Sequence, residues 1–206
     1  MNIELVKGRT AQETAYLTLR NAAMMGTFKA GQPITIRGVA NKLDMSATPI
    51  REAFRRLSTE RAFTVLENRR IMIPVLNQSQ LEELLELRVR LETHAAIRAV
   101  PYLSDKKIDK LIELDNACNE ALRQKDHSSV VAANQAFHSM LYKSNPEQII
   151  LPMIESVWLQ IGPVLKEAAT SVTLLEYDYH IDIIEALKER DTEAVSSAIE
   201  KIFGKA

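Results

Sequence analysis

The chain has 206 residues, of which 46% are hydrophobic and 26% are charged, a composition typical of a folded globular protein and not of a disordered one. The only cysteine, Cys118, excludes an intramolecular disulfide framework and a zinc cage built from thiolates. The N-terminal residues include charged side chains, and no segment reaches the ~20 apolar residues of a membrane span. We therefore expect a cytoplasmic protein with no membrane partner.

The net charge of -1 conceals an uneven distribution of charge along the chain. Residues 1–75 contain 12 Lys and Arg against 6 Asp and Glu, which gives +6. Of the 26 basic and 27 acidic residues in the whole chain, 14 and 21 remain for the rest, which gives -7. This division predicts two domains, at residues 1–76 and 77–206, and only the first has the charge to meet nucleic acid.

The first third begins with two predicted helices. A helical pattern stops at Gly26, and the Gly/Pro-containing stretch 29–35 predicts a turn. Thr35 can cap a second helix that continues to Leu43. Asp44 follows in a turn, where Asp tolerates the left-handed backbone conformation that turns often need.

The stretch "MSATPIREAFRRL", residues 45–57, predicts the third helix. Ser46 or Thr48 can cap it, and Pro49 stands in its first turn, where a missing N–H is harmless. Its apolar residues form one buried stripe, at Ile50, Ala53, Phe54 and Leu57. Its arginines therefore face elsewhere, at Arg51, Arg55 and Arg56. Two short apolar runs around residues 67–70 then predict a hairpin, and the whole order is that of a winged helix-turn-helix.

The rest of the chain reads as helix throughout. The predicted helices span residues 79–100, 104–125 and 127–144, one that starts after Asn145-Pro146, and then 171–190 and 191–203. Ser79 and Glu82 have the spacing of a capping box for the first of them. Short loops between helices of this length predict an antiparallel six-helix bundle, so the fold class is mainly α.

Several motifs in the right order resemble the GntR family of bacterial transcription regulators, in its FadR subgroup. They are "SATPIREAFRRLSTERAF" (46–63), "ELRVRLE" (86–92), "NQAFH" (134–138) and "YHIDIIEALKERDTEA" (179–194). The last three resemble the FCD effector domain, in the VanR-like six-helix branch, and the resemblance covers essentially the whole chain. It implies a homodimer on a pseudopalindromic operator, with a bundle that binds a small molecule.

We expect the DNA contacts to come from the second and third helices and the hairpin. The candidate residues are Arg37, Ser46, Ala47, Thr48, Arg51, Arg55, Arg69 and Arg70. By resemblance, Arg37 and Arg51 occupy two DNA-contacting positions of the family. Ala47 stands where the family usually has Arg, and Arg70 stands where its wing usually has Gly. The operator sequence is therefore expected to differ from the family's usual one.

The candidate effector site lies in the bundle. Asn134 and His138 are four residues apart and share a helical face. In many FCD domains the resemblance implies a divalent metal held by one Asp and three His. Here Asn134 replaces the Asp and Ile202 replaces the last His. Because His138, His180 and an amide fall short of three good donors, we predict no metal cofactor, and keep Asn134, His138 and His180 as an alternative metal site.

Without a metal, Asn134, His138, His180 and Arg88 can form a polar pocket for a small organic acid, with Arg88 supplying the charge. Two alternatives stay open at this point. The histidines can be structural core residues, and Arg88 can pair with Glu86, Glu92 or a carboxylate of another helix. The predicted function is a DNA-binding repressor. A sensor or adaptor without DNA specificity is the first alternative. An enzyme is disfavoured because the sequence shows no nucleophile–base pair, full metal set or Gly-rich phosphate loop.

Overall fold

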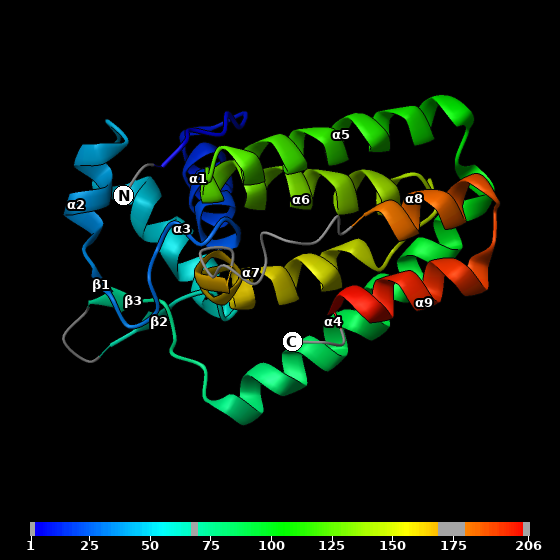
Figure 1. Cartoon of the computed structure of the whole chain (residues 1–206). Helices are drawn as coiled ribbons and strands as arrows, with labels where there is room; N and C mark the ends of the chain where they lie inside the picture. The colour runs from blue at the N-terminus through cyan, green and yellow to red at the C-terminus, as the bar shows by residue number, and fades with distance from the viewer. Residues whose placement is uncertain (1–2, 67–69, 169–179, 204–206) are drawn as a thin grey trace. The chain divides into compact units, whose positions relative to one another are not determined.

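Figure 1 shows a computed structural model of the chain, in which residues 3–66, 70–168 and 180–203 are described. The chain folds into two compact units. The N-terminal unit contains residues 1–77 and 158–167, and the helical unit contains residues 78–157 and 168–206. The predicted fold class, mainly α with a winged helix-turn-helix followed by a helical domain, is confirmed.

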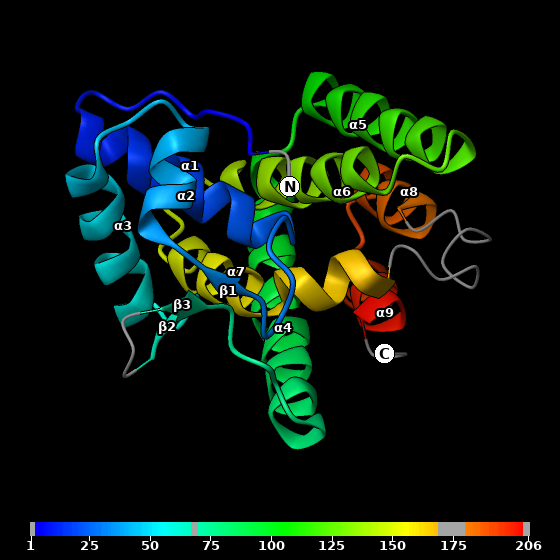
Figure 2. The same ribbon diagram turned by 90° about the vertical axis from the view of Figure 1, so that its left-hand side faces the viewer.

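The N-terminal unit is built on α1 (Ala11–Met24), α2 (Ile36–Lys42) and α3 (Ala47–Thr59), which Figure 2 shows together. The α1 helix ends just before Gly26, whose φ of 59° is the left-handed conformation that glycine adopts easily. Thr35 caps α2, because its side chain accepts the N–H of Gly38. Asp44 has a φ of 51° in the turn before α3. The predictions for these caps and turns are confirmed.

The start of α3 differs from the expectation in one respect. Ser46 occupies the N-cap position, but its side chain makes no capping hydrogen bond, and Thr48 already lies inside the helix. An N-cap side chain binds the N–H of the second or third helical residue. The third residue is Pro49, which has no N–H, so one of the two targets is missing.

The sheet has three short antiparallel strands, β1 (Pro33–Ile34), β2 (Thr64–Val65) and β3 (Ile71–Met72), in the order β1-β3-β2. The predicted hairpin is β2 and β3, and its tip, residues 67–69, lies outside the described residues. The stretch 29–35 was expected to be only a turn, but its end forms β1, with Pro33 opposite Met72. A proline can occupy this place because β1 is an edge strand.

Aromatic side chains form much of the core of the N-terminal unit. The ring of Phe63 meets the rings of Phe28 and Phe54 edge to face, with centroids 5.3 and 5.0 Å apart. Part of α7 (Leu151–Ala168) completes this unit. At Gly162 an added Cβ would lie 2.3 Å from the carbonyl oxygen of Ala23, so only glycine allows the approach of these two helices.

In the helical unit, the described helices are α4 (Gln78–Ala99), α5 (Asp105–Arg123), α6 (His127–Lys143), the first part of α7, α8 (Ile181–Lys188) and α9 (Thr192–Phe203), with a 3₁₀ turn at Val100–Tyr102. The α4 helix packs against α6 and α9, and α5 packs against α6 and α8 (Figure 1). No helix within the described ranges combines the length and apolar character needed to cross a membrane.

The α4 helix begins one residue earlier than expected, so Ser79 lies inside it and not at its cap. The carboxylate of Glu82 accepts a hydrogen bond of 2.7 Å from the side chain of Gln78. The predicted partner in the capping box is therefore replaced by a side chain four residues away, at the spacing of one helical turn.

The α7 helix begins at Leu151, several residues after the expected start. Asn145 explains the delay, because its side-chain oxygen accepts the N–H of Glu147 and closes a local turn. Gln148 then accepts the N–H of Leu151 at 2.8 Å, as a cap would. For the next helix, residues 171–179 of the expected range lie outside the described part, and α8 begins at Ile181.

Candidate nucleic-acid interface and buried polar cluster

The exposed face of α3 carries four of the predicted DNA-binding residues. Ala47, Thr48, Arg51 and Arg55 are all exposed and, at about 100° per residue, fall within one arc of about 100°. The buried stripe lies on the other side of the helix. Arg55 has its Nε 3.7 Å from Glu52 Oε2, but both side chains are exposed, so the pairing is weak. The face is thus free to exchange its partners for another anion.

Arg56 lies away from this face. Its guanidinium carbon is 3.5 Å from the centre of the Tyr16 ring, and its Nε is 3.4 Å from Glu60 Oε1. The hydroxyl of Tyr16 donates to the same carboxylate at 2.8 Å, and Arg20 lies 3.6 Å from it. Burial, together with Glu60, raises the pKa of Tyr16. Arg56 therefore joins α3 to α1, although the sequence placed it with the other arginines.

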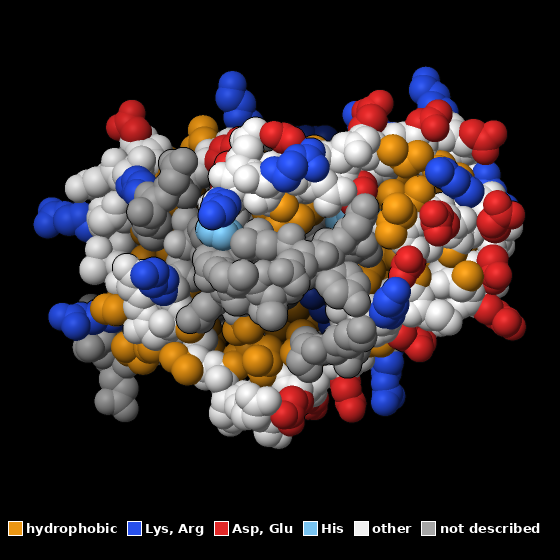
Figure 3. Space-filling view, in the orientation of Figure 1, with side chains coloured by type: hydrophobic (Ala, Val, Ile, Leu, Met, Phe, Trp, Pro, Cys, Tyr) orange, Lys and Arg blue, Asp and Glu red, His pale blue; other side chains and the backbone are white. Residues whose placement is uncertain are grey.

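The remaining candidates are distributed over three elements. Arg37 is exposed in the first turn of α2, Ser46 is exposed at the head of α3, and Arg70 is exposed just before β3. Arg69 lies outside the described residues. Figure 3 shows Lys and Arg side chains projecting from the N-terminal unit and many Asp and Glu side chains on the helical unit. An exposed basic surface on a helix-turn-helix suits the phosphates and base edges of DNA.

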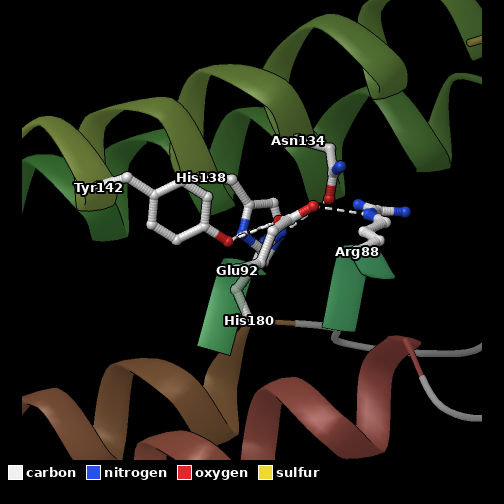
Figure 4. Close-up of polar contacts among 6 residues, drawn as sticks. All are labelled: Arg88, Glu92, Asn134, His138, Tyr142 and His180. Carbon is white, nitrogen blue, oxygen red and sulfur yellow. Dashed lines mark hydrogen bonds and ion pairs between the residues drawn. The ribbon is translucent and has the colours of Figure 1, made fainter. Parts of the chain in front are cut away.

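A buried polar cluster forms inside the helical unit, and Figure 4 shows most of its members. Arg88 Nε lies 2.7 Å from Glu92 Oε1, one turn further along α4. The other carboxylate oxygen of Glu92 accepts from the Tyr142 hydroxyl of α6 at 2.5 Å. The same hydroxyl lies 3.1 Å from His138 Nδ1. All four residues are buried, so these contacts are strong relative to surface ones.

His180, the residue before α8, closes the other end of the cluster. Its Nδ1 lies 2.7 Å from Asp115 Oδ1 of α5, and its Nε2 lies 3.0 Å from Asn134 Oδ1 of α6. The ring stacks on Phe137 with centroids 4.0 Å apart, and the His138 centroid is 5.2 Å away. We call the whole set the buried polar cluster: Arg88, Glu92, Asp115, Asn134, His138, Tyr142 and His180.

The four predicted effector residues therefore all belong to one cluster, but sequence reasoning missed two of its members. Asp115 occupies a buried position of α5 between Leu111 and Cys118, and an acid within an apolar stripe was a readable signal. Tyr142 follows His138 by four residues and so shares its face. These two residues supply the partners that orient the histidine rings.

The charges within the buried polar cluster partly neutralise one another. Arg88 is paired with Glu92, so its guanidinium has a partner before any ligand arrives. The guanidinium also lies 3.8 Å from the centre of the Phe203 ring. Burial lowers the pKa of His138 well below its usual range, with further contributions from His180 and Arg88.

The described donors of the buried polar cluster do not by themselves fit a metal ion. Among the described residues, no group of three His, Cys, Asp or Glu side chains is placed to hold one. His180 Nε2 faces Asn134, whose neutral amide is a poor ligand. Ile202, at the position where the resemblance implies a histidine, offers no donor atom. A site with three good protein ligands is therefore not built from these side chains.

Two known protein families match parts of the chain. Residues 11–73 match the family "Bacterial regulatory proteins, gntR family", and residues 83–204 match the FCD domain. The chain belongs to the GntR family. Its FCD domain and its relatives place it in the FadR-like subgroup, as the sequence motifs predicted, and its homologues are transcriptional regulators.

Individual relatives of this GntR-family chain support the assignment along its whole length. The HTH-type transcriptional regulator McbR of Escherichia coli K12 is 30% identical over 190 residues, 90% of this chain and 86% of that one. The HTH-type transcriptional repressor RspR of the same strain is 22% identical over 89% of this chain and 82% of its own. The structure of E. coli McbR/YncC superposes with a TM-score of 0.90 at 26% identity, covering 96% and 95% of the two chains. A GntR regulator from Rhodococcus sp. RHA1 gives 0.75 at 25% identity, covering 95% of this chain and 94% of that one.

Proposed function

We propose that this GntR-family regulator is a homodimeric repressor of a pseudopalindromic operator, and that a small effector bound in its helical unit changes operator affinity. The observation that carries the DNA-binding part is the exposed α3 face with Arg51 and Arg55. A relative bears the name of a repressor, RspR, which supports the sign of regulation. In a dimer, each copy of α3 can contact one half-site of the operator.

Arg37 and Arg51 are the residues with the chemistry to read or grip DNA. A guanidinium can donate two hydrogen bonds to guanine O6 and N7, or to a pair of phosphate oxygens. Ala47, exposed at the head of α3, can contact only an apolar group such as a thymine methyl. We therefore expect the base opposite Ala47 to be a thymine or to be weakly specified.

The effector is proposed to act at the buried polar cluster without a metal cofactor. An effector that binds one of two arrangements of the protein better than the other shifts the population toward it. A differential affinity of a few kcal/mol is sufficient. A small organic acid, the expected class, would have to draw Arg88 away from Glu92, because the two are 2.7 Å apart and buried. Binding of the effector must therefore release enough free energy to offset the loss of the Arg88–Glu92 ion pair.

Operator binding can be tested with the DNA upstream of the protein's own gene against a scrambled duplex of equal composition. We expect preference for the native duplex and a steep fall of affinity with salt. Arg51→Ala should weaken binding by ~1–3 kcal/mol and reduce the salt slope. Arg90→Ala, an exposed arginine of α4 paired with Glu86, is the matched control and should leave affinity unchanged.

Equal affinity for the native and scrambled duplexes would contradict the proposal. That result would favour a sensor or adaptor that has lost DNA specificity, which the alanine at position 47 makes the second candidate. The effector part is tested separately, by thermal melts of chelator-treated protein with a panel of small organic acids, with and without Zn²⁺ or Mn²⁺. Stabilisation that requires the metal would overturn the metal-free site. Light scattering of the free protein tests the homodimer.

A further inference from the structure

One nitrogen of the buried polar cluster has no hydrogen-bond partner among the described residues. The His138 ring is fully buried, and its Nε2 makes no hydrogen bond within the part of the chain that the structure describes. A buried polar atom left without a partner costs about 1–3 kcal/mol. Such atoms are rare in native structures, so each one points to a missing partner or a functional role.

The neighbours of His138 determine which of its two nitrogens carries the proton. The Tyr142 hydroxyl has a single proton, and Glu92 Oε2 lies 2.5 Å from it. A carboxylate attracts that proton more strongly than a neutral imidazole does, so Tyr142 donates to Glu92. Burial raises the pKa of Tyr142 well above its usual range, so the hydroxyl keeps its proton. Because its proton goes to Glu92, the Tyr142 oxygen can act only as an acceptor toward His138 Nδ1, which lies 3.1 Å away.

His138 Nδ1 must therefore carry the ring proton, and Nε2 presents a bare lone pair. Arg88 supports this arrangement from the far side, because it donates to the other oxygen of Glu92 and holds the carboxylate in place. In this chain of contacts, Arg88 and Tyr142 both donate to Glu92, and His138 Nδ1–H donates to the Tyr142 oxygen.

The lone pair itself disfavours a carboxylate oxygen as its partner. Arg88, the guanidinium of the buried polar cluster, already contacts Glu92. A carboxylate oxygen placed near His138 Nε2 would bring two lone pairs together with no proton between them. An N–H or O–H group would supply the proton that the nitrogen lacks.

We propose that Tyr142 and Glu92 are positioning residues that fix His138 as a buried hydrogen-bond acceptor. The effector then presents an N–H or O–H donor to Nε2, as an amide, amine or hydroxyl compound does, and not a carboxylate oxygen. This inference rests on the proposed function, because it takes the buried polar cluster as the effector site. It adds one requirement to the proposed effector: whatever group reaches Arg88, the molecule carries an N–H or O–H donor for His138 Nε2.

The first test measures the ring tautomer by long-range ¹H–¹⁵N NMR of the ¹⁵N-labelled full chain, without any ligand. The chain has four histidines, and a His138→Gln variant identifies the signal of His138. We expect the Nδ1–H tautomer in the wild type and loss of this preference in Tyr142→Phe. An Nε2–H tautomer in the wild type would overturn the proposal even if the variant failed to fold.

The second test compares acetamide and acetate, which have the same shape but differ in charge and in donor groups. We expect acetamide to move the His138 Nε2 signal and acetate at equal concentration to leave it in place. An equal or larger response to acetate would overturn the donor class. A response to neither would show that the lone pair is not a ligand site, and the proposal would fail. Operator binding, measured on the same samples, separates each of these failures from a failure of the DNA-binding function.

Discussion

The guanidinium carbon of Arg56 lies 3.5 Å from the centre of the Tyr16 ring, whereas Arg55, one residue earlier, has 81% of its side chain exposed. Two adjacent arginines of α3 therefore have different tasks. Arg56 connects α3 to α1 through Tyr16 and Glu60, and Arg55 belongs to the exposed face. The difference follows from the helical angle of about 100° between neighbouring residues.

We predict that Arg55→Ala and Arg56→Ala separate binding from stability. Arg55→Ala should weaken operator binding by ~1–3 kcal/mol and leave the melting temperature unchanged. Arg56→Ala should lower the free energy of unfolding by about 1 kcal/mol, which is ~2–4 °C in Tm for a chain of this size. Fluorescence anisotropy with operator DNA and thermal denaturation measure the two effects. The reverse pattern, with Arg56 controlling affinity alone, would contradict the assignment.

The local elements of the N-terminal unit could be predicted because their signals lie within a few residues. The Thr35 cap and the turn at Asp44 are read from adjacent positions and are found as expected. The strand β1 could not be predicted, because Pro33–Ile34 is a strand only through its pairing with β3, almost forty residues later. Two residues carry too short a pattern to indicate a strand.

The candidate site also has parts that the sequence could predict and parts that it could not. The spacing of Asn134 and His138 placed them on one face, and the structure finds both in the buried polar cluster. The contact between Asp115 and His180 joins residues 65 positions apart, so no local pattern contains it. The sequence leaves the partner of Arg88 open among Glu86, Glu92 and a carboxylate of another helix, and burial of one face of α4 decides for Glu92.

Asp115 should be important for the stability of the helical unit. It accepts from His180 at 2.7 Å and from Asn119 at 3.1 Å, and its loss removes the acceptor that the buried Nδ1 of His180 faces. We predict that Asp115→Ala lowers the free energy of unfolding by ~1.5–3 kcal/mol. Asp109→Ala, an exposed change on the same helix, is the control and should have little effect. Urea denaturation with equal m-values for both variants measures the difference, and equal midpoints would contradict the prediction.

The buried His138 should make stability depend on pH. Its folded pKa is lowered by burial and by His180 and Arg88, and among the described residues Glu92 and Tyr142 also face it. In the unfolded chain the pKa is about 6.5. Below that value the unfolded state binds more protons than the native state. The stability should therefore fall as pH decreases from about 6.5 toward the folded pKa, by up to about 1.4 kcal/mol per pH unit.

Urea denaturation between pH 7.5 and 5 measures this dependence. In His138→Phe the slope should be smaller than in the wild type, whatever the stability of the variant at pH 7.5. His94→Gln removes an exposed histidine and should keep the wild-type slope. Identical slopes in all three proteins would show that His138 does not titrate differently in the two states.

Gly162 provides a prediction in which two effects have opposite signs. Replacing a glycine inside a helix by alanine normally stabilises by up to about 1 kcal/mol. Here the new Cβ would lie 2.3 Å from the carbonyl oxygen of Ala23 and 2.7 Å from that of Met24. Both are backbone atoms of α1, so neither can rotate away as a side chain would. The clash must therefore move one helix of the N-terminal unit relative to the other.

We expect this cost to exceed the gain in helix propensity. Gly162→Ala should lower the free energy of unfolding by about 1–3 kcal/mol, the usual cost of overpacking. Met153→Ala, an exposed change on α7, is the control and should change stability by less than about 0.5 kcal/mol. Thermal denaturation of both variants measures the two effects. A Gly162→Ala protein more stable than the wild type would show that α1 and α7 can separate at no cost.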